Sequence, residues 1–212
     1  MAAQLMNLLK LGGPVAVILV LMSVVATVLA LLKQYWFFRN GVGRHREAMA
    51  ALDLWNAGQR ERAAHALASP RNALSRVVAH AFSLIARSKH AYEPAKEDVL
   101  RLALDEIREM KKYLRGIEVI AQTAPLLGLL GTVVGMIEAF NRLESSGAAV
   151  NPAQLAGGIW TALLATALGL MIAIVFSLVG AWFEAKVERE RAVMESLLTS
   201  LFARAELDTA SS

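Results

Sequence analysis

The hydrophobic and polar positions of this chain define three long uncharged runs separated by segments rich in charge. The first run covers 11–32, and its 22 residues would form a helix of about 33 Å, close to the roughly 30 Å hydrocarbon core of a bilayer. An aromatic and basic cluster typical of a membrane interface follows: Lys33, Tyr35, Trp36 and Arg39. The pattern predicts a transmembrane helix over 11–36. The competing interpretation, a cleaved signal peptide, calls for a shorter apolar region of about 7–15 residues.

The second uncharged run, 119–137, predicts a transmembrane helix over 118–140, in which Pro125 should bend the chain. An apolar stripe with spacings of three and four runs into this helix from the preceding segment, which predicts one very long helix. Large residues occupy the first half of the stripe and only Ala and Gly the second half. Its members are Leu100, Ala103, Ile107, Met110, Leu114, Ile117, Ala121, Ala124, Gly128, Gly131 and Gly135.

The third uncharged run, 145–183, begins with a polar, turn-forming stretch. We therefore expect its helix to start with Asn151 as cap and Pro152 in the first helical position. The spacing predicts a transmembrane helix over 153–183 and a helical tail over 184–212 that continues it. Small residues occupy about a third of the surface of this span: Gly158, Ala162, Ala165, Thr166, Gly169, Ala173 and Gly180.

Small residues let helices approach closely within a membrane. Packing of Gly128, Gly131 and Gly135 within one subunit and packing between subunits are both compatible with the pattern. Two spans that each carry a wide small-residue face favour an oligomer, because three helices of one chain supply few partners.

The distribution of Lys and Arg predicts the orientation in the membrane. The segment 33–115 holds 16 of the 22 basic residues, and the tail after Phe183 holds four more. The positive-inside rule therefore places a helical segment over 37–117 and the C-terminal tail in the cytoplasm. The N-terminus, 1–10, and the loop 141–152 then lie in the periplasm. This distribution accounts for the net charge of +4 without nucleic-acid binding.

The cytoplasmic segment is predicted to be helical throughout. Ser69 and Pro70 are expected to cap and open one helix, and Pro94 to begin the next. The fold class is thus an all-α integral membrane protein with three transmembrane helices and long cytoplasmic extensions. At 56% hydrophobic residues, the composition exceeds that of an ordinary soluble domain, about 45–50%.

No pattern in the sequence predicts an enzyme, a metal site or a cofactor site. The chain has no cysteine, and its four histidines have no metal-ligand spacing. The polar residues within the predicted spans are not ionisable: Gln122, Thr123, Thr132, Thr161, Thr166 and Ser177. Glu118 and Glu138 bracket the second span. A proton crossing here therefore needs a carrier from a partner or from ordered water.

Two of these threonines, Thr132 and Thr166, lie on the small-residue faces of the second and third spans. Their hydroxyls could hydrogen-bond a visiting carboxyl group in either protonation state, since a hydroxyl both donates and accepts. The alternative is a hydroxyl bonded to a carbonyl of its own helix, which is common for threonine.

Two segments of the chain resemble the signature spans of the MotA/TolQ/ExbB proton-channel family: TAPLLGLLGTVVGMIEAF, 123–140, and GGIWTALLATALGLMIAI, 157–174. The segment LKLGGPVAVILVLMSVVA resembles the first span of ExbB-type members. The resemblance implies a pentameric ring in the bacterial inner membrane that encloses the single transmembrane helices of an ExbD- or TolR-like partner. An Asp of that partner would carry the proton, and the motor would energise a TonB- or TolA-like protein.

The resemblance also implies that Thr132 and Thr166 are pore-lining threonines. Thr161 stands where many ExbB and TolQ members carry Glu, so a role of that Glu does not transfer to this chain. A TolQ-type subunit of the Tol-Pal envelope system and a non-conducting membrane scaffold remain alternatives. A stator of the MotA type fits less well, because that type has four spans and a larger cytoplasmic insertion.

Overall fold

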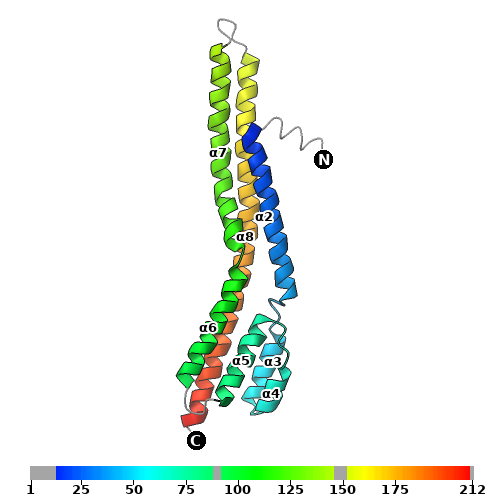
Figure 1. Ribbon diagram of the computed structural model, residues 1–212, viewed down its shortest axis with the longest axis vertical. Helices are drawn as coiled ribbons and strands as arrows, with labels where there is room; N and C mark the ends of the chain where they lie inside the picture. The colour runs from blue at the N-terminus through cyan, green and yellow to red at the C-terminus, as the bar shows by residue number, and fades with distance from the viewer. Residues whose placement is uncertain (1–12, 88–91, 146–151, 211–212) are drawn as a thin grey trace. The chain divides into compact units, whose positions relative to one another are not determined.

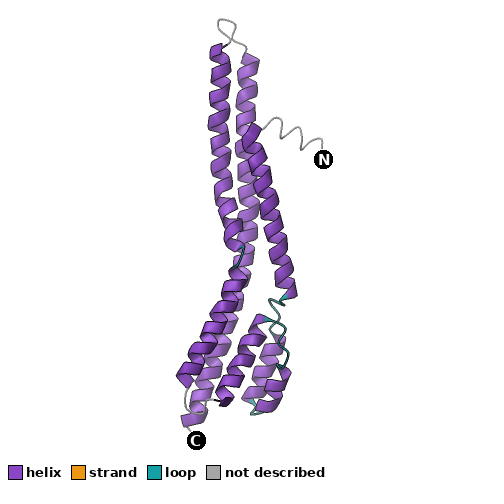
Figure 2. Ribbon diagram, viewed as in Figure 1, coloured by secondary structure: helices purple, strands orange, loops and turns teal. Residues whose placement is uncertain are grey.

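The computed structural model describes residues 13–87, 92–145 and 152–210, and all the regular structure in these ranges is α-helical (Figures 1 and 2). The chain divides into two compact units, which are described separately. Unit 1 comprises 1–32 and 113–182, and unit 2 comprises 33–112 and 183–212. The helices, in order, are α2 (Gly13–Arg39), α3 (Arg46–Asn56), α4 (Arg60–Ala66), α5 (Ala73–Arg87), α6 (Tyr92–Lys111), α7 (Leu114–Ser145) and α8 (Pro152–Ala210).

Three helices, α2, α7 and α8, are long and apolar enough to cross a membrane. This confirms the predicted class, an all-α integral membrane protein. Helix α8 begins at Pro152, as predicted, and runs without a break from the third span into the tail; Asn151 lies outside the described residues. Trp160 and Trp182 are both exposed on α8, and their separation of 22 positions corresponds to about 33 Å of helix. Indole rings at that separation match the two interfaces of a bilayer.

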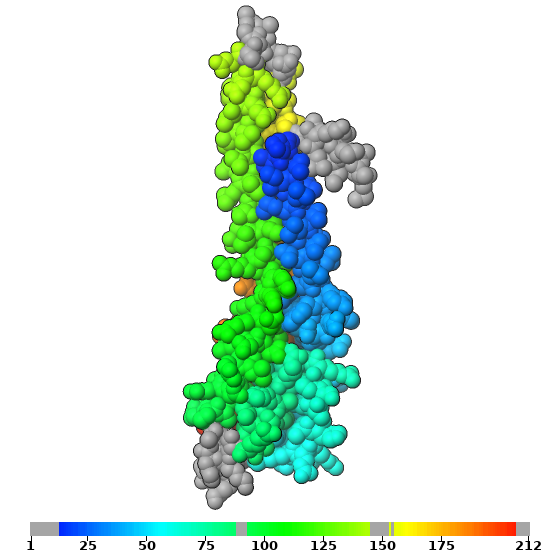
Figure 3. Space-filling view, viewed as in Figure 1, coloured from blue at the N-terminus to red at the C-terminus, as the bar shows by residue number. Residues whose placement is uncertain are grey.

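Unit 1 packs α2 against both α7 and α8. Figure 3 shows α2 (blue) beside α7 (green). Its buried cluster joins Val15 and Leu19 of α2 to Ala124 of α7. Partly buried apolar residues from α7 and α8 surround that cluster: Leu127, Leu168 and Ile172. The remaining apolar surface of the three helices is exposed, as expected for side chains that face lipid.

The small-residue faces of α7 and α8 pack against each other within one chain. A Cβ atom added at Gly128 would lie 3.0 Å from the Ala165 carbonyl oxygen, and one added at Gly135 would lie 2.9 Å from the Cβ of Ala162. One added at Gly169 would lie 2.5 Å from the Ala124 carbonyl oxygen. Backbones at this distance leave no room for side chains, so the glycines are required at the seam.

The other predicted packing residues take part in the same seam. A Cβ at Gly131 would lie 2.7 Å from the Cβ of Ala165, and one at Gly158 would lie 2.7 Å from the Cβ of Ala139. This packing decides between the two alternatives in favour of contacts within one subunit. The two faces are thus partners of each other within the chain, and the association of several copies stays a prediction.

Unit 2 combines α3 to α6 with the part of α8 after Trp182. Its core is aliphatic and aromatic. The rings of Trp55 on α3 and Phe82 on α5 stack with centroids 4.2 Å apart. A bidentate ion pair joins α5 to α6: Arg76 donates to the Glu106 carboxylate through Nε at 2.7 Å and Nη2 at 2.6 Å. This hydrogen bonding raises the pKa of the Arg76 guanidinium, so it stays charged at physiological pH.

The structure corrects three predicted helix boundaries. Helix α6 begins at Tyr92 and contains Pro94 in its first turn, so Pro94 does not begin it. The stripe that was expected to form one continuous helix is interrupted between α6 and α7, at Lys112 and Tyr113. Tyr113 has φ 69°, in the left-handed region that a helix cannot include. Helix α5 begins at Ala73, and its cap is Asn72, whose Oδ1 accepts the Ser75 N–H at 2.7 Å; Ser69 and Pro70 are not its cap and first residue.

Lys33 does not form part of an exposed interfacial anchor. Its side chain is 1% exposed, and its ammonium lies over the Trp36 and Phe37 rings at 4.7 and 4.8 Å from their centroids. It also donates to the Glu109 carbonyl at 3.5 Å, in the last turn of α6. Carbonyls there carry the negative end of the helix dipole, which favours a cation.

Candidate functional site

The candidate site lies on the seam between α7 and α8, where Thr166 connects the two helices. Its hydroxyl donates a hydrogen bond of 2.9 Å to the carbonyl of Gly128 across the seam. The contact requires Gly128, because a Cβ there would lie 3.0 Å from the Thr166 Cα. The alternative of a hydroxyl bonded to its own helix is therefore wrong for Thr166.

Thr132 follows the opposite pattern. Its hydroxyl donates at 2.7 Å to the Leu129 carbonyl of its own helix. In a regular α-helix the backbone N–H of residue 132 bonds to the carbonyl four residues earlier, which is that of Gly128. The Thr132 backbone and the Thr166 side chain thus meet at one carbonyl oxygen, and the structure brings these two predicted site residues together.

Thr161 belongs to a different side of α8. Its hydroxyl donates to the Gly157 carbonyl of its own helix at 2.9 Å. Leu168 follows seven residues, or about two turns, later and packs against the α2 cluster. At about 100° per residue, Thr161 shares the stripe of α8 that faces α2, not the one that carries Thr166.

The donor protons of all three threonine hydroxyls are already used in hydrogen bonds within unit 1. What each hydroxyl still offers is its acceptor lone pairs. A protonated carboxyl group can donate to those lone pairs, whereas an ionised carboxylate needs a donor. The prediction that the hydroxyls of Thr132 and Thr166 bind a carboxyl group in either protonation state stays a prediction, and the arrangement described here favours the neutral acid.

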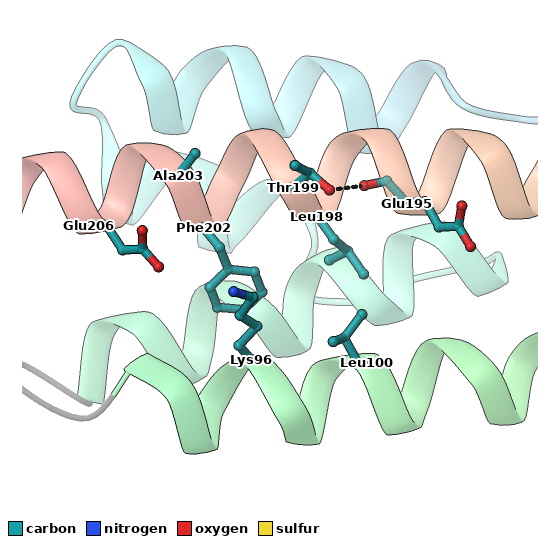
Figure 4. Close-up of a pocket in the computed structure, with 8 residues that line it drawn as sticks. All are labelled: Lys96, Leu100, Glu195, Leu198, Thr199, Phe202, Ala203 and Glu206. Atoms are coloured by element: carbon teal, nitrogen blue, oxygen red, sulfur yellow. Dashed lines mark hydrogen bonds between the residues drawn. The ribbon is translucent and has the colours of Figure 1, made fainter.

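Unit 2 contains one groove with a mixed lining, of about 200 Å³, between α6 and the tail of α8 (Figure 4). The Thr199 hydroxyl at its edge donates to the backbone carbonyl of Glu195 at 2.7 Å. An apolar floor and a charged rim make it a surface for packing. The lining residues are Lys96, Leu100, Glu195, Leu198, Thr199, Phe202, Ala203 and Glu206.

Sequence reasoning missed a buried acidic group in unit 2. Glu190 of α8 is 4% exposed, and its Oε1 lies 2.8 Å from Nε2 of His45, just before α3. The pair ties the loop after α2 to α8. The helical spacing of the tail could not reveal a partner 145 residues away.

The three apolar helices and their glycine seam define an α-helical integral membrane protein. Comparison with known proteins then identifies the family. Residues 69–196, more than half of the chain, match the MotA/TolQ/ExbB proton channel family, and the chain belongs to that family. The matched region contains the whole α7–α8 seam. The family is one of membrane proton channels and is not an enzyme family.

Several proteins named as biopolymer transport proteins, some of them putative, are similar to this chain. Biopolymer transport protein exbB1 of Vibrio cholerae is 36% identical over 136 residues, 63% of this chain and 58% of that protein. A putative ExbB homolog of Methanothermobacter thermautotrophicus is 32% identical over 57% of this chain and 41% of that protein. The chain thus spans about half the length of these two relatives. A putative ExbB-like protein of Synechocystis is 28% identical over 87% of both chains.

Proposed function

We propose that this chain is the ring-forming subunit of a motor of the ExbB type, driven by the proton-motive force. It would lie in the bacterial inner membrane with its N-terminus in the periplasm and its C-terminus in the cytoplasm. Five copies would enclose the single transmembrane helices of an ExbD-like partner, and the motor would energise a TonB-like protein for outer-membrane transport. Family membership and the likeness to biopolymer transport proteins support this proposal.

The observation that carries the proposal is the hydrogen bond from the Thr166 hydroxyl of α8 to the Gly128 carbonyl of α7, about one turn from Thr132. The uncharged runs 119–137 and 145–183 around this contact hold no ionisable side chain. This chain can accept a hydrogen bond from a neutral acid there, but it cannot itself bind and release a proton. The titrating group must therefore come from another chain. A carboxyl group on a helix enclosed by the ring meets this need, since protonation makes it a donor to the threonine lone pairs.

The energetics fit a change between two arrangements of packed helices. One proton that crosses 100 mV releases about 2.3 kcal/mol. That is comparable with the cost of breaking and remaking one or two hydrogen bonds, at about 1 kcal/mol each. In our proposal the neutral acid passes the threonine step, whereas the ionised acid lacks a donor there and is held back.

Substitution of the two threonines tests this step. We expect Thr132→Val and Thr166→Ala to reduce proton uptake by about fivefold each in vesicles that contain the purified complex with its partner, because each removes one hydrogen bond to the passing acid. Thr166→Ser retains a hydroxyl and should conduct nearly as the wild type does. The mass of the intact complex is the control for assembly. Full conduction in both variants would refute the threonine step.

The same purified complex in vesicles distinguishes the proposed ExbB-type subunit from the two alternative functions. A TolQ-type subunit would purify with a TolR-like partner and support envelope integrity through a TolA-like protein. A membrane scaffold would assemble but give no proton uptake in the wild type. A mass of the complex that excludes five copies would contradict the pentamer without affecting the threonine step.

A further inference from the structure

The polar side chains of unit 1 are distributed unevenly over its surface. Gln122 of α7 and Ser177 of α8 are exposed within the predicted spans, and neither makes a hydrogen bond in the described chain. By contrast, the rest of the exposed surface of α8 between Trp160 and Trp182 is apolar. It carries Leu163, Met171, Ile174 and Leu178. An exposed carboxamide and hydroxyl without partners are costly against hydrocarbon and mark a surface that meets water or another polypeptide.

Gln122 lies on the stripe of α7 that carries Thr132. The positions between them recur at spacings of three and four, through Pro125 and Leu129, which gives one continuous stripe. This stripe lies away from α2, whose contacts on α7 involve Leu127 and a different side of the helix. The polar groups of α7 therefore share a side that its own chain leaves open.

Ser177 repeats this arrangement on α8. It follows Thr166 by 11 residues, or about three turns, so the two hydroxyls share a face. The antiparallel pairing of the helices sets the level along the axis. Gly180 lies opposite Ile117, and Gly169 lies opposite Ala124. Residues 122 and 177 both fall between these two contacts, so Gln122 and Ser177 lie within about one helical turn of each other along the axis.

Two further hydrogen-bonding groups lie beside Gln122. Pro125 has no N–H, so the carbonyl of Ala121 lacks its usual intrahelical donor and can accept from water. Glu118 lies one turn before Gln122 on the same stripe, and its carboxylate is exposed. From Thr132 to Glu118, the stripe thus leads from the two threonines toward the N-terminal end of α7, which follows the basic segment in the sequence.

We propose that Gln122 and Ser177 form the cytoplasmic mouth of the proton route and hold the water that receives the proton. The inference rests on the proposed function and on its orientation in the membrane. The carboxylic acid of the enclosed helix loses its proton and becomes a carboxylate. A water molecule held by the Gln122 carboxamide and the Ser177 hydroxyl accepts that proton and passes it to cytoplasmic water beside Glu118. Gln122 and Ser177 are positioning residues, and neither changes its protonation state.

The test measures proton uptake by vesicles that contain the full complex with its partner, under an imposed membrane potential. We expect Gln122→Leu and Ser177→Ala each to lower the rate by about fivefold, because each removes a hydrogen bond to the relaying water. Gln122→Glu and Ser177→Thr keep hydrogen-bonding groups and should restore the rate. Thr27→Val on α2 is the matched control, since its exposed hydroxyl bonds only to Ser23 of its own helix.

Each result has one meaning. If both Gln122→Leu and Ser177→Ala took up protons at the wild-type rate, the proposed cytoplasmic mouth would be refuted, and the proposed function would be unaffected. Absence of uptake by the wild-type complex would refute the proposed function itself. Loss of the partner from the Gln122→Leu complex, seen by mass measurement, would assign Gln122 to assembly and would also overturn the mouth. Failure of Gln122→Glu to restore conduction would exclude the hydrogen-bonding role.

Discussion

At the scale of single residues, the glycines of the α7–α8 seam show how close packing of two helices limits the size of the side chain at a position. Hydrophobicity provides little association between helices in lipid, so close backbone contact replaces it. Gly169 is the most tightly enclosed, because an added Cβ would lie 2.5 Å from a backbone carbonyl oxygen that cannot turn aside. Gly157, near the start of the same helix, has nothing within 4 Å of an added Cβ.

This contrast gives a prediction for two alanine variants. Gly169→Ala should lower the free energy of unfolding by about 1–3 kcal/mol, because α7 and α8 must move apart. Gly157→Ala is the control and should be neutral or stabilising by up to about 1 kcal/mol, since alanine favours a helix over glycine. Denaturation in detergent, followed by circular dichroism, measures both. Equal stability of the two variants would contradict the described seam.

At the scale of helices, unit 2 depends on contacts that join elements distant in sequence. The Arg76–Glu106 pair joins α5 to α6, and the Glu106 side chain is only 14% exposed. Partial burial and two parallel hydrogen bonds distinguish it from the exposed pair Arg101–Asp98, which lies within α6. Ion pairs in water contribute little, whereas bidentate and partly buried pairs contribute more.

Lysine substitutions separate these two kinds of ion pair. Arg76→Lys should cost about 1 kcal/mol of the free energy of unfolding, because an ammonium cannot make the bidentate contact. Arg101→Lys should change it by less than about 0.5 kcal/mol, since its pair is exposed. The decisive measurement is the difference between the two variants in the same detergent. A Glu106→Gln background should remove most of the Arg76→Lys effect, and an unchanged effect there would show that the ion pair is not its cause.

At the scale of the whole molecule, the boundary between the two units follows the distribution of charge. All basic residues except Lys10, Arg115 and Arg142 belong to unit 2. The three spans belong to unit 1 apart from the ends of α2 and α8. A division of this kind is expected when one unit is solvated by lipid and the other by the cytoplasm.

Because the chain has no cysteine, single substitutions can report the orientation directly. Glu144→Cys, at the exposed end of α7, should react with a membrane-impermeant maleimide added outside spheroplasts. Glu61→Cys, exposed on α4, should react only after the membrane is opened. The reversed labelling pattern would invert the proposed orientation and would place Gln122 and Ser177 at the periplasmic end.

The sequence by itself determined the membrane spans, their glycine faces and the candidate threonines. Runs without charge, spacings of three and four, and residue size are local properties that follow from helix geometry and the thickness of a bilayer. Local spacing placed Thr132, Thr166 and Gly128 on the small-residue faces of the second and third spans. It could not decide whether those faces pack within one chain or between chains, because a face has the same pattern in both cases.

Only the tertiary structure decided the partners of those faces. It paired α7 with α8, brought the Thr166 hydroxyl to the Gly128 carbonyl and placed Thr161 on the side of α2. It also buried Lys33 and Glu190 against groups far along the chain and broke the long stripe at Tyr113. The physical reason is that hydrogen-bond partners and the burial of a charge depend on which helices approach each other in three dimensions, and that approach is not encoded in the period of any one helix.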